Sequence, residues 1–326
     1  MHILFLDSQR SAHHDRFENL LNRVGNVVSI YLFEQTDIPQ ESFDLIVFAD
    51  LDLTCLQAGN FSAPKIAISW AWDLQKTLRS NPQQEELLKY ALSIASLLIV
   101  DCDNVCEIAL GYGIEFDKII TVPFGIDLDR YKFQPSIREE DGLIRLYSNR
   151  KWEPIYRNEL ILEAVTYLNR NEEKYFLTLA NDGTTRKELV GKFYHLFDSN
   201  VCKWIGRVSE ADNIANLIQS DLYVSTSKSD GSSISLLEAM AIGTPVLITD
   251  NSPNREWIID GKSGYLFSGD SGLELAEKIH ITMSSASRPK SLLSTARNTV
   301  ERRADWHIIE EIITHAIIIL IEKQKQ

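Results

Sequence analysis

The chain of 326 residues has no long apolar run, and we expect neither a membrane-spanning segment nor an export signal in it. It has no stretch of about 18 apolar residues, and the apolar run AIIILI near its C-terminus is too short to cross a bilayer. The opening segment HILFLD is short and already acidic at its end, which is typical of a first β-strand and not of a signal peptide. We therefore expect a cytoplasmic protein, with at most a peripheral association with the inner face of the membrane.

Cysteine is scarce, and the glycine motif of nicotinamide-binding proteins is missing. The four cysteines have no spacing typical of zinc ligands, and a chain of this length needs no disulfide. We expect them to be reduced and buried; they are Cys55, Cys102, Cys106 and Cys202. No G-x-G-x-x-G follows the first predicted strand, so a nicotinamide cofactor is not expected.

Basic residues are too few, and too unevenly placed, for a nucleic-acid-binding protein. The first 143 residues carry 11 Lys and Arg against 22 Asp and Glu, whereas the rest carry 22 against 24. Binding to nucleic acid or to anionic lipid head groups depends on cationic side chains, so an acidic first half disfavours both. Docking on a membrane through apolar residues stays open.

Short apolar segments alternate with longer amphipathic ones along almost the whole chain. This alternation is typical of parallel βα units, and the length suits two domains of middling size. We therefore predict an α/β protein with two Rossmann-like, doubly wound parallel sheets. The strand candidates are HILFLD, VVSIYLF, FDLIVFAD, KIAISW, SLLIVDC and KIITVPF in the first half, and LIRLYSN, YFLTLAND, CKWIGR, LYVSTSK, PVLITD and GYLF in the second.

Helical patterns fill the intervals between these strands, and one polar stretch interrupts the alternation. The main helical segments of the second half are ELILEAVTYL, TRKELVGKFYHLF, ADNIANLIQ and SISLLEAMAI. The acidic stretch FQPSIREED, residues 133–141, predicts a boundary between domains 1–141 and 142–304. The last pattern, within residues 305–326, predicts a helix that could pack back on the first domain.

The segment from Leu222 to Asp260 is the most informative of the chain. A buried strand, LYVSTS, ends in the turn KSDGSS, and a helix is predicted to begin near Ser233. Gly243 and Pro245 are expected to end this helix. A turn rich in Gly and Ser leaves free N–H groups at the positive end of the helix dipole, which is a natural seat for a diphosphate.

Two carboxylates accompany this predicted anion site. Asp230 stands just before it, and Glu238 lies one turn past Ile234 on the same face of the helix. Taken singly, Asp230 could be a helix cap and Glu238 a solvated surface charge. Together with the Gly/Ser turn they favour recognition of hydroxyl groups, Asp230 on a sugar and Glu238 on a ribose.

The segment DGSSISLLEAMAIGTPVLITD, followed by REWIIDGKSGYLF, resembles the donor-site signature of the retaining glycosyltransferases of family 4. The resemblance extends through most of residues 118–320, including VPFGIDLDRY, and it is weaker in the first half, where ISWAWDL resembles a segment that lines the catalytic cleft. It implies the GT-B fold, with two Rossmann-like domains facing a central cleft. It also implies transfer of a sugar from a nucleotide-diphosphate sugar, with retention of configuration and without a metal or another cofactor.

The resemblance also implies roles for individual residues. Asp230 stands where the family has a Glu on the sugar, Glu238 matches the ribose ligand, and Arg150 matches an arginine that clamps the diphosphate, a task suited to its planar fork. The second cation of the family has two candidates, Arg157 and Lys151. The remaining donor-binding positions are Asp182 and Gly183, Arg207 and Val208, and Gly231, Ser232, Ser233 and Ile234.

The acceptor is implied to be a glycan or glycolipid of cell-surface polysaccharide synthesis, held by the first domain. Ser8 and Arg10 stand in place of a Gly-Gly loop, and Trp70 replaces a cleft histidine, which leaves Asp73 as the polar residue there. Asp73 is implied to position the acceptor while Arg150 and Asp230 act on the donor. Trp70 and Trp72 are either apolar packing or a platform on which a sugar ring stacks.

Several acidic and histidine motifs are set aside as candidate metal sites. Three Asp-x-Asp triplets follow predicted strands, where turns favour Asp: Asp50-Leu51-Asp52, Asp101-Cys102-Asp103 and Asp127-Leu128-Asp129. His13 and His14 are adjacent, so they would not face one site on a helix.

Two alternatives to a transferase stay open. The same fold could serve a sugar-nucleotide epimerase or hydrolase. The chain could also be an inactive subunit that scaffolds an active transferase. The missing Gly-Gly loop and Trp70 favour this alternative. The apparently intact set of diphosphate-binding residues speaks against the scaffold.

Overall fold

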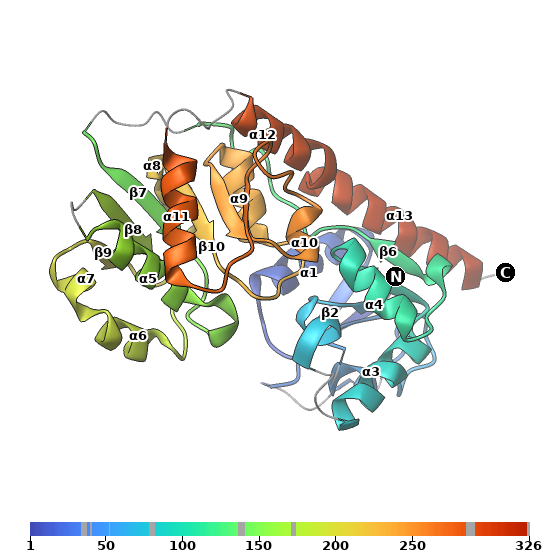
Figure 1. The fold of residues 1–326 in the computed structure, drawn as a ribbon. Coiled ribbons are helices and arrows are strands. Elements are labelled where there is room, and N and C mark those ends of the chain that lie inside the picture. The colour runs from blue at the N-terminus through green and yellow to red at the C-terminus, as the bar shows by residue number, and fades with distance from the viewer. Residues whose placement is uncertain are drawn as a thin grey trace. The chain divides into compact units, whose positions relative to one another are not determined.

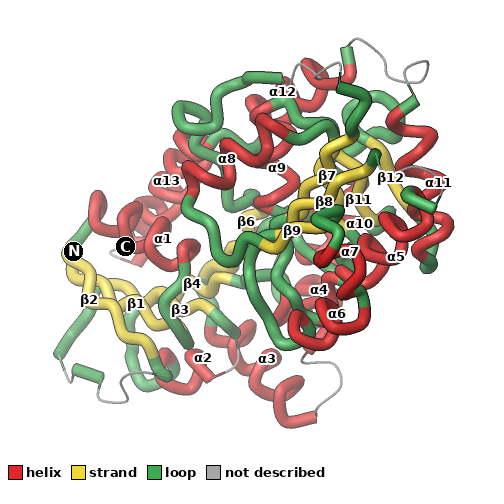
Figure 2. The backbone as a smooth tube through the Cα atoms, turned by 90° about the vertical axis from the view of Figure 1, so that its left-hand side faces the viewer, coloured by secondary structure: helices red, strands yellow, loops and turns green. Residues whose placement is uncertain are grey.

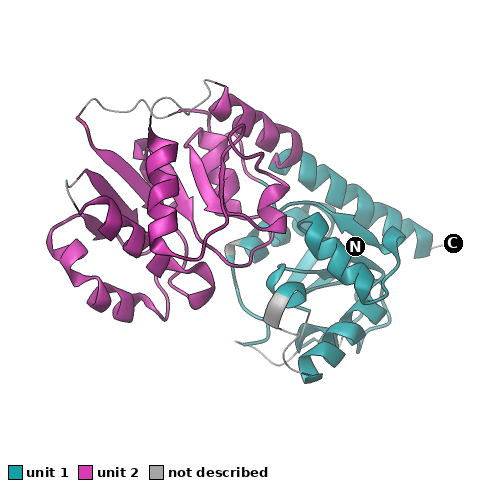
Figure 3. Cartoon of the chain, viewed as in Figure 1, with its two compact units in different colours: residues 1–125, 306–326 teal, residues 126–305 magenta. Residues whose placement is uncertain are grey.

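The protein is an alternation of β-strands and α-helices, as a computed structural model shows (Figure 1). The structure describes residues 1–33, 38–39, 41–51, 53–77, 82–135, 141–170, 174–284 and 291–324. The chain divides into two compact units, the first made of Met1–Gly125 with Trp306–Gln326 and the second of Ile126–Asp305 (Figure 3).

The first unit is built on a parallel sheet in the order β2-β1-β3-β4-β5-β6 (Figure 2). The chain turns back at β1, because β2 lies on one side of this strand and β3 on the other. The apolar residues of the central strands form its core, which explains why these strands read as continuous apolar runs. The strands are β1 (His2–Asp7), β2 (Asn26–Tyr31), β3 (Leu45–Ala49), β4 (Lys65–Ile68), β5 (Leu97–Val100) and β6 (Ile119–Thr121).

Helices join these strands, and the last helix of the chain belongs to the same unit. Within the unit, Arg23 near the end of α1 donates a hydrogen bond of 2.6 Å to the buried Glu310 of α13. The helical elements are α1 (Ala12–Val24), α2 (Leu53–Ala58), the π-helix η1 (Asp73–Thr77), α3 (Pro82–Ile94), α4 (Asp103–Gly111), the 3₁₀ turn η3 (Phe116–Lys118) and α13 (Trp306–Gln324).

The second unit repeats the plan with the strand order β12-β11-β10-β7-β8-β9. The chain turns back at β7, which has β8 on one side and β10 on the other. Alternate residues of these strands enter two separate apolar clusters, as expected for a sheet covered on both faces. The strands are β7 (Ile144–Ser148), β8 (Tyr175–Leu179), β9 (Cys202–Trp204), β10 (Leu222–Ser225), β11 (Val246–Thr249) and β12 (Tyr265–Phe267).

The helices of the second unit follow the predicted patterns with one interruption. The pattern TRKELVGKFYHLF predicts a single helix, but the structure breaks it at Phe193. The helical elements are the 3₁₀ turn η4 (Pro154–Tyr156), α5 (Asn158–Leu168), α6 (Arg186–Lys192), α7 (Tyr194–Asp198), α8 (Glu210–Gln219), α9 (Ile234–Ile242), α10 (Ser252–Arg255), α11 (Gly272–Met283) and α12 (Leu292–Arg303).

The boundary between the units lies earlier in the chain than the predicted boundary between residues 141 and 142. The segment after Gly125 packs within the second unit, where the backbone N–H of Ile126 bonds to the carbonyl of Ala304 and that of Gln134 to the carbonyl of Ile242. Tyr131 is also buried in the core of that unit. Residues 136–140 of the predicted linker lie outside the described residues.

The predicted fold class is confirmed, because both sheets are parallel, six-stranded and flanked by helices. The four cysteines are free and buried, as expected. No helix among the described residues combines the length and the apolar character needed to cross a bilayer.

Candidate donor site and first-unit residues

The predicted diphosphate seat lies at the point where the second sheet reverses its strand order. Strands β7 and β10 are parallel neighbours there, and their carboxyl ends face the same edge. Ligands of open α/β sheets bind at such switch points. Arg150 follows β7, and the turn with Asp230 and Ser233 follows β10, so residues about 80 positions apart in the chain meet at this edge.

Helix α9 begins directly after this turn. Ser233 is its N-cap residue but makes no capping hydrogen bond through its side chain, so the hydroxyl does not compete for the first N–H groups. Leu236, Leu237 and Met240 are buried, and they anchor the helix in the core. Gly243 ends the helix in the left-handed conformation with φ of 95°. The start of the helix is therefore held in place by its own packing.

Arg150 is the central cation of the site. Its Nη1 donates to Ser233 Oγ at 2.8 Å and its Nη2 to the Asp230 carboxylate at 2.5 Å, while its guanidinium lies 4.3 Å from the ring centre of Tyr156. Burial lowers the pKa of Arg150, but the charge of Asp230 together with the neighbouring Tyr223 and Tyr156 more than offsets this, and the pKa stands above its usual value. Its Nε is buried without a hydrogen-bond partner among the described residues.

Asp230 is the anionic partner of this arginine. A fifth of its side chain is exposed, which distinguishes it from the fully enclosed carboxylates elsewhere in the chain. Burial raises its pKa, and the charge of Arg150 opposes that shift. Removing one partner of a buried ion pair leaves an uncompensated charge and strongly destabilises the fold. Each of the two side chains therefore depends on the other for its place in the site.

Glu238 is held by two hydrogen bonds and is not a solvated surface charge. Its Oε1 accepts from the hydroxyl of Tyr131 at 2.6 Å, and its Oε2 accepts from the amide of Asn213 at 2.9 Å. Both donors are buried. Their positions in the sequence gave no indication of this contact, because Tyr131 lies 107 residues from Glu238 in the chain.

The two candidates for the second cation differ in their surroundings. Arg157 has a left-handed backbone, with φ of 48°, and its side chain bonds to the carbonyl of Thr226 and to the carboxylate of Asp270. It therefore ties together loops at the carboxyl edge of the sheet. Lys151 directly follows Arg150, and its side chain is exposed. Which of them contacts a diphosphate stays open.

The predicted loop after β8 is closely packed. Asp182 Oδ1 accepts hydrogen bonds from the N–H of Gly183 at 2.8 Å and from Arg186 at 2.6 Å, and the bond to Arg186 holds the pKa of this carboxyl below its usual range. A side chain at Gly183 would lie 2.5 Å from the carbonyl oxygen of Trp152, so only glycine fits there. Arg207 and Val208 lie in the neighbouring loop between β9 and α8, Arg207 exposed and Val208 partly buried.

The comparisons with known proteins cover the region of the chain that contains these residues. The family model described as glycosyl transferases group 1 matches residues 129–299, more than half of the chain, including every donor-site residue discussed above. The chain belongs to this family.

Two curated relatives resemble parts of the chain. The chain is 23% identical over 188 residues to the alpha-monoglucosyldiacylglycerol synthase of Streptococcus pneumoniae, covering 54% of this chain and 42% of that protein. It is 24% identical over 196 residues to the phosphatidyl-myo-inositol mannosyltransferase of Mycobacterium leprae, covering 58% of this chain and 50% of that protein. The chain thus spans about half the length of these relatives.

The similarity to solved structures covers nearly the whole chain. Anabaena HepE in complex with UDP-glucose has a TM-score of 0.78 at 18% identity, over 97% of this chain and 99% of that one. Sucrose-phosphate synthase from Thermosynechococcus elongatus has a TM-score of 0.79 at 15% identity, over 99% of this chain and 100% of that one. At these identities the likeness concerns the fold, which is GT-B.

In this group 1 glycosyltransferase the first-unit candidates lie at the carboxyl edge of their own sheet. Ser8 follows β1 and donates a short hydrogen bond to Asp50, which follows β3, so the pair bridges the switch point of the first sheet. Arg10 is exposed and pairs with Asp15 at 2.8 Å. Ser8 and Arg10 thus support the loop around α1, and their contact with an acceptor stays a prediction.

The two tryptophans have different surroundings. Trp70 packs against other aromatic rings, with centroids 5.0 Å from Phe124 and 5.6 Å from Phe17. The described ring contacts of Trp70 are those of apolar packing, and its role as a platform for a sugar ring stays a prediction. Trp72 has 42% of its surface exposed, so it is accessible to a ligand.

Asp73 is fully enclosed. Its carboxylate accepts hydrogen bonds from the hydroxyl of Ser69 and from the N–H groups of Leu74 and Leu51. Burial raises its pKa to about 6 against these hydrogen bonds, which lower it. The carboxylate therefore holds the loop after β4, and the contact with an acceptor that the resemblance implied stays a prediction.

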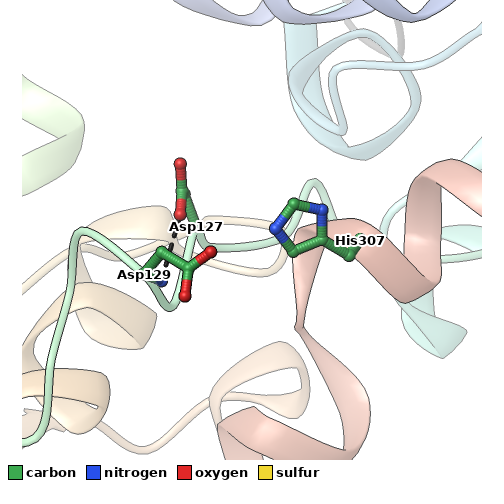
Figure 4. A group of neighbouring side chains, drawn as sticks. All are labelled: Asp127, Asp129 and His307. Carbon is green, nitrogen blue, oxygen red and sulfur yellow. Dashed lines mark hydrogen bonds between the residues drawn. The ribbon is translucent and has the colours of Figure 1, made fainter.

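Of the Asp-x-Asp triplets set aside as metal sites, Asp127-Leu128-Asp129 takes the turn geometry expected of it. Asp127 Oδ1 accepts hydrogen bonds from the N–H groups of Asp129 and Arg130 at 3.1 and 3.3 Å, which makes the triplet a turn (Figure 4). Figure 4 also draws His307, which belongs to the other unit. In the second triplet, Asp103 opens α4. Asp52 of the first triplet lies outside the described residues.

Adjacent His13 and His14 have separate surroundings. His14 has no exposed surface and pairs through Nδ1 with Asp7 at 2.9 Å, whereas the ring of His13 packs against Trp70. As expected, the two rings do not form one ligand pair.

Proposed function

We propose that this protein transfers a sugar from a nucleotide-diphosphate sugar to a hydroxyl group of an acceptor, with retention of configuration. The observation that carries the proposal is the arrangement at the start of α9, where a buried arginine is held against the helix N-terminus. Arg150 has both Nη atoms fixed by Ser233 and Asp230, and its third donor, Nε, has no partner within the described part of the chain. A buried donor of this kind suits an anionic ligand.

The reaction places negative charge where these groups lie. As the bond between the anomeric carbon and the diphosphate oxygen breaks, charge develops on the departing nucleoside diphosphate. The guanidinium of Arg150 and the free N–H groups of α9 would stabilise that charge. Electrostatic stabilisation of this kind is the largest contribution to catalysis in many enzymes. The acceptor oxygen would bond to the same face of the sugar, and its proton would pass to the leaving phosphate.

We further propose that the reaction needs no metal. The cations of the protein would neutralise the diphosphate, Arg150 first and either Lys151 or Arg157 second. Asp230 would hold hydroxyl groups of the transferred sugar, and Glu238 those of the ribose. The backbone around Arg207 and Val208 would lie against the base, and Asp182 with Gly183 would close the loop beside it.

The acceptor that we propose is a glycan or glycolipid of cell-surface polysaccharide synthesis, reached at the inner face of the membrane. The relatives named as a glucosyldiacylglycerol synthase and a phosphatidyl-myo-inositol mannosyltransferase support a glycolipid. In the first unit, the exposed side chains of Trp72 and Arg10 are accessible to an acceptor, whereas Ser8 is buried and would act through the loop that it supports.

A thermal-shift screen of UDP-, GDP-, ADP- and dTDP-sugars, each with EDTA present, tests this proposal. A bound donor raises the melting temperature by mass action, and we expect one base to stand out without added metal. Loss of both the shift and the turnover in EDTA, restored by magnesium or manganese, would contradict the metal-free proposal.

One observation favours the scaffold as a second candidate. Asp73, the polar residue implied for the acceptor side, is fully enclosed and satisfied by groups of its own loop. A donor that binds tightly but is neither transferred to any acceptor nor hydrolysed would support the scaffold over the transferase.

A further inference from the structure

Within the second unit, a series of hydrogen bonds between buried side chains leads from the surroundings of Arg150, the proposed diphosphate ligand, to Glu238, the proposed ribose ligand. It begins at the hydroxyl of Tyr223, which donates to Asn149 Oδ1 at 2.9 Å. The amide of Asn149 donates to Asn213 Oδ1 at 3.0 Å, and the amide of Asn213 donates to Glu238 Oε2 at 2.9 Å. Both asparagines and Tyr223 are buried, so water does not compete for these bonds.

The chain of bonds has one direction, because its ends fix it. Glu238 can only accept when ionised, so Asn213 must turn its amide nitrogen toward the carboxylate. The amide oxygen of Asn213 then receives two donors, Asn149 and the hydroxyl of Tyr147 at 2.9 Å. Each donor therefore points toward Glu238, an arrangement in which neighbouring bonds strengthen one another.

The other end of the chain lies beside Arg150. Burial raises the pKa of the Tyr223 hydroxyl to about 12, and the positive charge of Arg150 opposes this rise. The network thus has a cation at its donor end and an anion at its acceptor end, which is the favourable order. It links the two groups that would hold the diphosphate and the ribose.

The other carboxylate oxygen of Glu238, Oε1, is held by the segment that follows Gly125. Tyr131, which donates to Oε1 at 2.6 Å, is buried and follows Arg130, whose guanidinium pairs with Glu210 at the start of α8 at 2.8 Å. Asn213 lies on the same helix α8. The pair between Arg130 and Glu210 therefore holds together the two elements that supply the donors.

We propose that Asn213 and Tyr131 are positioning residues that orient Glu238 toward the hydroxyl groups of the donor's ribose. This inference rests on the proposed function, because it assumes that a nucleoside diphosphate binds at this edge of the sheet. A glutamate side chain that is free to change its rotamer presents its carboxylate in many directions. Two fixed donors, one on each oxygen, hold the carboxylate of Glu238 in a single orientation. The two residues thereby set the preference for a ribonucleotide over a nucleotide without ribose hydroxyl groups.

The test uses the full chain and isothermal titration calorimetry. UDP, GDP and ADP are titrated first, and the tightest of them is compared with its 2′,3′-dideoxy analogue. We expect the wild-type protein to prefer the ribonucleotide by about tenfold to a hundredfold, since hydrogen bonds to a charged group are lost in the analogue. In Tyr131→Phe and in Asn213→Asp this ratio should fall to about threefold or less.

Tyr175→Phe is the matched control. It removes the hydroxyl of another buried tyrosine of the second unit, which bonds to His280. It should keep the wild-type ratio, so that a change in Tyr131→Phe reports position and not a general loss of stability. Tyr131→Phe removes a single atom and is expected to fold even where Asn213→Asp does not.

The outcomes separate the inference from the function on which it rests. If UDP, GDP and ADP all fail to bind the wild-type chain, the positioning inference is wrong, and if dTDP fails to bind as well, the proposed function falls with it. If one of them binds and Tyr131→Phe keeps the wild-type preference for ribose, the positioning role is wrong while the donor site stands.

Discussion

Among single residues, Arg150 and Asp230 show how a reactive site is assembled from a few fixed side chains. The arginine has 8% of its side chain exposed and the aspartate 21%, so the carboxylate lies nearer to solvent than the guanidinium. A ligand that approaches the site would therefore meet Asp230 first. This order fits a carboxylate that holds the transferred sugar and a cation that holds the diphosphate behind it.

Asp230→Asn should raise the free energy of the transition state by about 2 kcal/mol, because the charged acceptor for sugar hydroxyls is lost. Turnover should therefore fall by roughly thirtyfold. Affinity for the free nucleoside diphosphate should not fall, since the change removes a negative charge beside Arg150. Asp230→Glu should also impair turnover, because Asp230 already lies 2.5 Å from Arg150 and an extra methylene has no room. Steady-state kinetics check this, with Asp141→Asn, an exposed pair partner of Arg145, as the control.

A rate that rises in Asp230→Glu would contradict this account of the aspartate. It would mean that the position still fits the glutamate of related enzymes, and the scaffold interpretation would gain.

The enclosed carboxyl of Asp73 should titrate near pH 6. Its folded pKa of about 6 lies above the ordinary value of 3.8, so between these values the folded state holds a proton that the unfolded state has lost. The free energy of unfolding should therefore fall as pH rises from about 4 to 6, by about 3 kcal/mol, and stay low above that window. Carbon-13 NMR of the side-chain carboxyl, assigned with Asp73→Asn, measures the titration, and a midpoint at or below pH 4 would refute it.

At the scale of secondary structure, the sequence was a good guide wherever one local rule decided the outcome. All twelve predicted strands are present, because buried parallel strands are continuous apolar runs bounded by turns. Helix α9 begins and ends where its Ser and Gly residues predict. The single predicted helix over residues 185–197 is broken at Phe193, where the side chain enters the core and the periodicity of the pattern gives no indication of a break.

In the candidate site, too, some contacts follow from a local rule and others do not. Arg150 and the turn with Asp230 follow strands, so their meeting at one edge could be predicted from the parallel sheet. The bond between Tyr131 and Glu238 could not, because it depends on how the segment after Gly125 packs on the second unit. Asn213 offered a weak signal, since it lies one turn before the buried Leu217 and so on the core face of its helix.

Gly243→Ala should destabilise the second unit by about 2 kcal/mol. The residue has φ of 95°, and a side chain there would lie 2.7 Å from the ring of Phe133, so both strain and overlap oppose it. Gly191→Ala is the matched control, because Gly191 lies in helix α6 with nothing within 4 Å of the added carbon and should be neutral or slightly stabilising. Denaturant unfolding midpoints compare the two, and equal midpoints would contradict the role of Gly243 as a helix stop.

At the scale of the whole molecule, the proposed ligand, a nucleoside diphosphate, has the same sign of charge as the protein, whose net charge is −13. Most of the excess acid belongs to the first 143 residues, and the rest of the chain is nearly balanced. Charges beyond about 10 Å are largely screened at physiological salt, so the local field decides. In the second unit that field comes from a buried arginine and the N-terminus of α9.

Binding of the nucleoside diphosphate to Arg150→Ala, measured by calorimetry on the full chain, is the most direct test of this account. Loss of the charge-assisted donor should weaken binding by about tenfold to a hundredfold, and Arg150→Lys should recover only part of it, since an ammonium lacks the planar fork. Arg145 lies near the start of β7, whereas Arg150 follows the end of this strand, so Arg145→Ala should bind as the wild-type protein does. Wild-type affinity in a folded Arg150→Ala would contradict the assignment of the diphosphate to this site.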